Sequence, residues 1–195
     1  MLGLGTGQSL TPIFQELIQR YERKEISFKN VIVFNAYEYF PLKADSPHSA
    51  LEQLKTRFLN HVDILEQNVY SLDGTVAQDT VQEQCRLFEE RIQTFGGIDI
   101  MLLGIGRIGN IATNEPGSVI SSSARLILID ATSREEMTMS TGARSSLFYH
   151  VGSCQYPCLA QDLPDGVGRR ESRYHQGNGR RPHERCHSGF FLAES

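Results

Sequence analysis

The chain lacks the features that mark membrane and nucleic-acid-binding proteins. No apolar run approaches the roughly 18 residues of a membrane-spanning helix, and no signal peptide is visible at the amino terminus. Net charge is −4 over 195 residues, and acids and bases are dispersed, so nothing favours nucleic acid or an anionic membrane. We therefore expect a cytoplasmic protein with neither kind of partner.

Cysteine is also scarce. The four cysteines are unevenly placed and form no disulfide framework, which fits a reducing cytoplasm. Residue types that bind zinc do occur late in the chain, as Cys154-x-x-x-Cys158 and His183-x-x-Cys186-His187. Their spacing matches no common structural zinc site closely. We expect no metal.

The carboxyl-terminal part lacks four common residue types altogether. Residues 143–195 contain no Ile, Lys, Met or Thr, yet they hold three of the four Cys, four of the six His and seven Arg. An ordinary globular domain does not change composition so abruptly. The sequence therefore predicts two units, a folded body over residues 1–142 and an aberrant, poorly ordered tail over residues 143–195.

The body alternates short apolar runs with amphipathic segments. Apolar runs that predict buried strands lie at residues 1–4, 30–35, 69–72, 97–103 and 124–129. Helical spacing of apolar residues predicts helices from Pro12, from Ser46-Pro47 and over residues 80–95. Such alternation, with strands apolar on both faces, predicts an α/β fold: a parallel sheet in a three-layer α/β/α domain.

Three loops follow predicted strands, where an open α/β sheet places its ligand. They cover residues 5–9, 35–39 and 104–117. The first reads Gly5-Thr6-Gly7-Gln8-Ser9 and precedes a helix, so its hydroxyl and N–H groups suit a phosphate. In the third, Gly104, Gly106 and Gly109 allow a ligand to approach the backbone closely. The alternative is that all three are ordinary strand-to-helix turns.

Four segments make the body resemble a known family. They are LGLGTG at 2–7, SFKNVIVFNAYEYFPL at 27–42, NHVDI at 60–64 and LGIGRIGNIATNEPGS at 103–118. These resemble the glucosamine-6-phosphate deaminase/isomerase family. The resemblance implies the fold shared with ribose-5-phosphate isomerase and CoA transferases. It also implies conversion of glucosamine 6-phosphate to fructose 6-phosphate and ammonia, in amino-sugar metabolism, with a sugar phosphate as partner, no cofactor and possible homo-oligomers.

The resemblance also implies roles for single residues. The family's phosphate cradle matches Gly5, Thr6 and Gly7, with Ser9 close behind. Its proton-abstracting Asp falls at Tyr37, beside a retained Glu38 that is a candidate substitute base. The family's phosphate-binding Arg in the following helix falls near Met139.

In the long loop the family's Asp falls at Ile108, its His at Asn110, and its Glu is retained as Glu115. Asn110 cannot carry a proton near neutral pH, and Tyr37, with an ordinary pKa near 10, is a weak base. The alternative to deaminase activity is therefore a non-catalytic sugar-phosphate-binding relative or an inactive gene product. Glu115 could equally serve only to cap the turn.

The tail is compatible with a shifted reading frame. Codons for residues 161–181 can be chosen that, read one nucleotide later, encode KIYLMAWGEEKADIIKETVEG. That text predicts a buried strand, a glycine and an amphipathic helix, the next unit of a parallel α/β sheet. We therefore expect a frameshift near residues 138–144. We also expect the natural start to lie upstream, because Met1 begins within a predicted strand.

Overall fold

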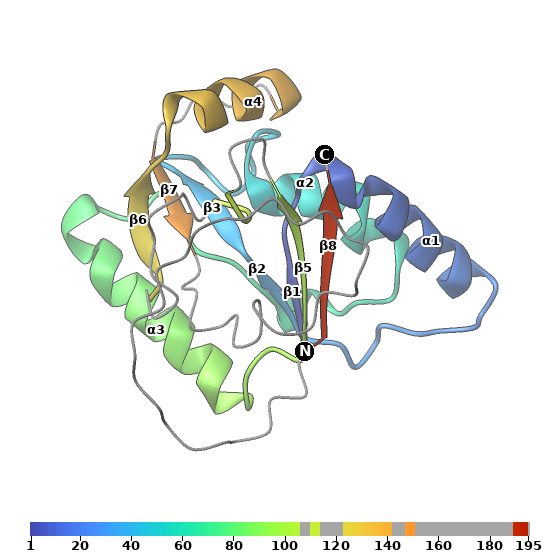
Figure 1. The fold of residues 1–195 in the computed structure, drawn as a ribbon. Helices are drawn as coiled ribbons and strands as arrows, with labels where there is room; N and C mark the ends of the chain where they lie inside the picture. Colours follow the sequence, from blue (N-terminus) through green and yellow to red (C-terminus); the bar gives the residue numbers. More distant parts are fainter. Residues whose placement is uncertain (106–109, 114–122, 142–146, 151–188, 195) are drawn as a thin grey trace, which may run out of the picture.

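The computed structural model describes residues 1–105, 110–113, 123–141, 147–150 and 189–194, and its central element is a parallel sheet (Figure 1). This sheet has the order β4-β2-β1-β5-β8, and each neighbouring pair is parallel. Its strands are β1 (Leu2–Leu4), β2 (Val33–Asn35), β4 (Val69–Tyr70), β5 (Ile100–Ile105) and β8 (Gly189–Glu194). The α/β fold with a parallel sheet is thus confirmed.

The helices begin and end at local signals in the sequence. The chain forms α1 (Thr11–Glu22), α2 (Ala50–Arg57), α3 (Val81–Thr94) and α4 (Ala131–Thr141). Short 3-10 turns are η1 (Gln8–Leu10), η2 (Leu59–His61), η3 (Glu66–Asn68) and η4 (Gln78–Thr80). Pro12 lies in the first turn of α1, where its missing N–H loses no helical bond. Gly96 and Gly97, at φ of 94° and 95°, follow α3 in a conformation that favours glycine.

Helices cover both faces of the parallel sheet, with α1 and α2 on one side and α3 on the other (Figure 1). Two apolar cores correspond to these faces. Val33 and Leu102 pack with Phe14 of α1 and Leu54 of α2. The neighbouring strand residues Phe34, Met101 and Leu103 pack instead with residues of α3 that include Val81, Phe88 and Ile92. Alternate strand residues point to opposite faces, so apolar runs fill both cores.

A second, antiparallel sheet departs from the prediction. It has the order β3-β7-β6, formed by β3 (Tyr37–Phe40), β7 (Leu147–His150) and β6 (Arg125–Leu128). The prediction placed residues 124–129 in the parallel sheet and residues 35–39 in a loop, and both placements were wrong. An apolar run predicts a strand but does not specify which strand it will pair with.

The start of α2 also differs from the prediction. The expected opening at Ser46-Pro47 was wrong, because the helix begins at Ala50 and Ser49 is its N-cap. The Ser49 hydroxyl accepts the Glu52 N–H at 2.9 Å. A serine in this position satisfies one of the N–H groups that the first turn leaves without a helical partner.

Two described segments beyond residue 142 pair with strands of the body. β7 lies beside β3 and β6, and β8 lies beside β5. The rest of residues 143–195 falls outside the described residues, so the predicted division at residue 142 and the frameshift remain predictions.

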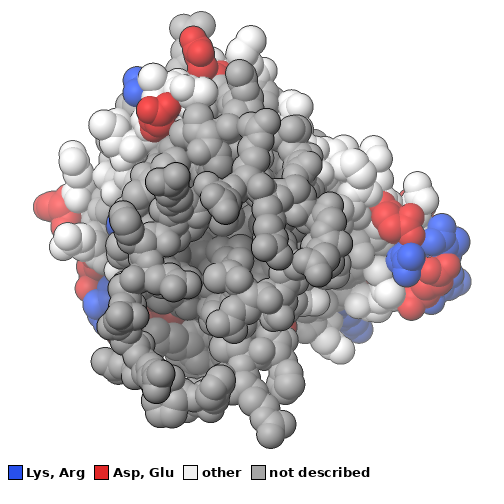
Figure 2. All heavy atoms as spheres, viewed as in Figure 1, with Lys and Arg blue, Asp and Glu red and all other residues white. Residues whose placement is uncertain are grey.

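Charged side chains of both signs lie together on the helical surface. At the right of Figure 2, over α1, acidic and basic groups intermingle. Arg20 donates to Glu16 at 2.7 Å, and Arg23 donates to Glu25 at 2.7 Å. Every helix in the described parts of the chain is too short or too polar to span a lipid bilayer.

Candidate functional site

The strand order brings two of the predicted loops together. β1 lies between β2 and β5, and the Gly5 N–H donates to the Leu102 carbonyl at 2.9 Å. The segment Gly5–Ser9, which we call the 5–9 loop, continues into η1 and α1. It passes close to the end of β5, because a Cβ added to Gly104 would lie 2.9 Å from the Ser9 Oγ. A larger residue at position 104 would therefore displace Ser9.

Tyr37 fastens the 5–9 loop to β3. Its hydroxyl lies 2.8 Å from the Thr6 Oγ1 and accepts the Thr6 N–H at 3.2 Å. Both side chains are buried, with 6% of Tyr37 and 2% of Thr6 exposed. Burial raises the pKa of Tyr37 above its ordinary value of 10.0, and the hydrogen bonds with Thr6 offset part of the rise. Tyr37 is therefore a protonated phenol at neutral pH.

Arg57 holds the same loop from another element. It is the last residue of α2, and its Nη1 donates to the Thr6 carbonyl at 2.7 Å. The sequence analysis did not identify Arg57. The only signal was a cation at the end of a helix, which is common because helix C-termini favour positive charge.

Glu38 faces away from Thr6. Its carboxylate accepts the N–H groups of Tyr39, Ala50 and Leu51 at 2.8, 2.7 and 3.0 Å. Two of these donors are in the first turn of α2, whose N–H groups have no partner within the helix. Burial raises the pKa of the Glu38 carboxyl, and the three N–H groups offset part of that rise. In this structure Glu38 is an anchor between β3 and α2.

Asn110 is buried with an unused acceptor. Its Nδ2 donates to the Ala112 carbonyl at 2.9 Å, while its Oδ1 finds no partner among the residues described. Asn35 at the end of β2 is similar, since its Nδ2 donates to the Ser71 Oγ at 3.0 Å and its Oδ1 is left without a partner there. Buried amide oxygens of this kind can accept bonds from ligand hydroxyl or amine groups.

Several predicted site residues lie outside the described residues. These are Gly106, Ile108, Gly109 and Glu115. The Cys and His residues with zinc-ligand chemistry lie outside them as well. Within the described ranges, no group of His, Cys, Asp and Glu side chains could hold a metal ion.

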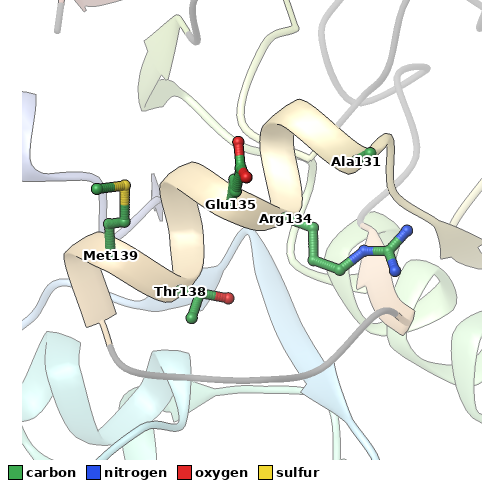
Figure 3. A pocket seen from close by; sticks show the side chains of 5 residues that line it. All are labelled: Ala131, Arg134, Glu135, Thr138 and Met139. Atoms are coloured by element: carbon green, nitrogen blue, oxygen red, sulfur yellow. The ribbon is translucent and has the colours of Figure 1, made fainter.

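A shallow hollow of about 260 Å³ lies against α4, apart from the 5–9 loop (Figure 3). Its lining residues are Ala131, Arg134, Glu135, Thr138 and Met139. Met139, near which the resemblance implies a phosphate-binding Arg, is 87% exposed. Arg134 lies five residues before Met139 on α4 and lines the same hollow.

Comparison with known proteins identifies relatives of this chain in sequence and in fold. The family model described as glucosamine-6-phosphate isomerases/6-phosphogluconolactonase matches residues 1–143. A solved monomeric glucosamine-6-phosphate deaminase superposes with a TM-score of 0.74 at 29% identity, covering 79% of this chain and 64% of that one. A 6-phosphogluconolactonase from Thermotoga maritima shares the fold, with a TM-score of 0.56 at 14% identity over 77% of this chain and 61% of that one.

Curated relatives carry the same family name. A glucosamine-6-phosphate deaminase of Dictyostelium discoideum is 44% identical over 65% of this chain and 46% of its own length. A deaminase-like protein of Bacteroides thetaiotaomicron is 55% identical over 70% of this chain but 20% of its own length. The chain thus spans less than half of these relatives. The match over residues 1–143 and the shared fold show that the chain belongs to the glucosamine-6-phosphate isomerase/6-phosphogluconolactonase family.

Proposed function

We propose that this chain binds a sugar phosphate at the carboxyl ends of β1 and β5 and acts as a glucosamine-6-phosphate deaminase. The observation that carries the proposal is the juxtaposition of the 5–9 loop with Gly104. Leu10 and Thr11 donate their N–H groups to the Gly7 and Gln8 carbonyls, so the N–H groups of Gly7 and Ser9, which precede these bonds, are the ones we propose for the phosphate oxygens. The deaminase names of the relatives support this substrate.

The reaction requires a base as well as a phosphate site. It opens the sugar ring, moves the proton alpha to the carbonyl and releases ammonia, and each step needs a group that exchanges a proton. Glu115 is proposed as the acid–base group of the long loop, where Gly104, Gly106 and Gly109 would let the substrate approach. The buried Asn110 amide would orient a substrate hydroxyl without exchanging a proton.

A second candidate is sugar-phosphate binding without turnover. It is favoured by Tyr37, which stands at the position of the family's proton-abstracting Asp. Its hydroxyl is engaged with Thr6, and burial keeps it protonated. Glu38 is poorly placed to replace it, since its carboxylate is directed to the start of α2 and already accepts the N–H groups of Tyr39, Ala50 and Leu51.

One pair of measurements separates the two candidates. The full chain is assayed for ammonia release from glucosamine 6-phosphate, and binding of the same compound is measured by calorimetry. Turnover supports the deaminase, and saturable binding without ammonia supports the binding protein. Unphosphorylated glucosamine is the control ligand and should bind far more weakly. Absence of both binding and turnover contradicts both candidates.

The setting of the protein is part of the proposal. A sugar phosphate is a charged metabolite that does not cross membranes unaided, so we place the protein in the cytoplasm with this small molecule as its partner. A homo-oligomer is possible in this family, although one solved relative is monomeric.

A further inference from the structure

The 5–9 loop needs support from outside because its own residues supply little. Gly5 and Gly7 carry no side chains that could pack and hold the backbone, and glycine has the greatest conformational freedom to lose. Gly7 itself has φ of −57° and ψ of 148°, an extended conformation that any residue adopts. Backbone bonds tie the segment at two points, the Gly5 N–H to the Leu102 carbonyl and the Gly7 carbonyl to the Leu10 N–H. Between these two points, Thr6 makes contacts with other elements.

Thr6 is held through both of its neighbouring peptide groups. Its N–H donates to the Tyr37 hydroxyl at 3.2 Å, which fixes the Gly5–Thr6 peptide. Its carbonyl accepts from Arg57 Nη1 at 2.7 Å, which fixes the Thr6–Gly7 peptide. The carbonyl and N–H of a trans peptide point in opposite directions. Because Arg57 holds the Thr6 carbonyl, the Gly7 N–H points away from α2.

The charge of Arg57 is not neutralised by a nearby acid. Its guanidinium makes no ion pair with any carboxylate in the described part of the chain, whereas Arg20, Arg23 and Arg86 all do. Its side chain is half-buried. A hydrogen bond from a charged donor is about twice as strong as a neutral one, and it polarises the peptide so that the N–H on the other side becomes a better donor.

We propose that Arg57 is a positioning residue for sugar-phosphate binding: it clamps the Thr6–Gly7 peptide and presents the Gly7 N–H to the phosphate ester. The inference rests on the proposed function, because it assumes that the 5–9 loop receives the phosphate. The inference extends the proposed function, because it assigns the orientation of the 5–9 loop to Arg57 on α2, which lies 51 positions after Thr6 in the sequence. A positioning role needs the contact with the loop that the structure shows and needs no contact with the substrate.

The test compares Arg57→Ala, Arg57→Lys and Lys55→Ala in the full chain. Calorimetry gives the Kd for fructose 6-phosphate and for unphosphorylated fructose. We expect Arg57→Ala to weaken fructose 6-phosphate binding about tenfold, or about 1.4 kcal/mol, with little change for fructose. Arg57→Lys should recover part of the loss, because an ammonium can donate to the same carbonyl. Lys55→Ala removes the same charge from α2 without touching Thr6 and should bind as the parent does.

Amide hydrogen exchange over residues 5–10, measured without ligand, separates this inference from the proposed function. Faster exchange in Arg57→Ala but not in Lys55→Ala supports the clamp, whether or not the parent binds a sugar phosphate. If the parent binds no sugar phosphate, only the proposed function is contradicted. Unchanged exchange overturns the clamp. Equal Kd values for the parent and Arg57→Ala, with the parent binding well, overturn it too.

Discussion

Tyr37 and Glu38 are neighbours on β3, and their side chains serve opposite sides of the strand. The Tyr37 hydroxyl reaches the 5–9 loop at Thr6. The Glu38 carboxylate reaches the first turn of α2. Both are buried and burial raises the pKa of both, yet one borders the candidate site and the other fastens a helix.

This difference shows how a site residue and a structural residue can be told apart. Successive strand residues point to opposite faces, so adjacency in sequence does not give adjacency at the site. Glu38 has the chemistry of a base, but its oxygens are committed to three backbone donors. Tyr37 has the position of the family's base but not its chemistry. The two substitutions below should therefore act on different properties.

The largest effect is expected from Glu38→Ala. It leaves the buried N–H groups of Tyr39 and Ala50 and the partly buried N–H of Leu51 without their acceptor, and we expect the free energy of unfolding to fall by about 3 kcal/mol. Urea denaturation followed by circular dichroism measures this loss.

Glu52→Ala is the matched control for Glu38→Ala. Glu52 is also an acid in the first turn of α2, but removing its side chain changes only its interaction with the helix dipole, worth about 0.5 kcal/mol. If both variants lost the same stability, the anchoring role of Glu38 would be contradicted.

A smaller effect is expected from Tyr37→Phe. The ring stays, but Thr6 loses the partner of its N–H and Oγ1, so we expect unfolding free energy to fall by about 1 kcal/mol and sugar-phosphate binding to weaken. Tyr70→Phe is the control, since Tyr70 stacks on Phe34 through its ring, with centroids 5.0 Å apart. Intact sugar-phosphate binding in Tyr37→Phe would show that Tyr37 does not support the loop.

The smallest effect concerns pH. The pKa of Glu38 is raised in the folded state above its ordinary 4.5, so between the two values the folded protein binds more protons than the unfolded one. Unfolding free energy should therefore fall as pH rises through this window. Glu38→Gln should remove that fall.

The pKa of Tyr37 is also raised in the folded state, above its ordinary 10.0, so the unfolding free energy should fall again as pH rises above about 10. Tyr37→Phe should remove only this alkaline fall. Urea midpoints across pH measure both, and identical profiles for parent and variants would contradict the assignment.

The sequence was most informative where structure depends on near neighbours. The apolar runs at residues 1–4, 30–35 and 97–103 predicted β1, β2 and β5, and the helical spacing at residues 80–95 predicted α3. The parallel direction of these strands then follows from the alternation of strands with helices. The same argument predicted the loop at residues 5–9, whereas residues 37–39 belong to β3 and most of residues 104–117 lies outside the described residues.

The α/β class, the parallel sheet, the family and the glycines at the carboxyl ends of β1 and β5 could all be predicted from the sequence, because each depends on local pattern. The separate antiparallel sheet that contains β3 and β6 is visible only in the folded structure. So are the contacts of Thr6 with Tyr37, 31 residues away, and with Arg57, 51 residues away. Such contacts depend on how distant elements pack, so the identity of a residue does not predict which distant residue it will contact.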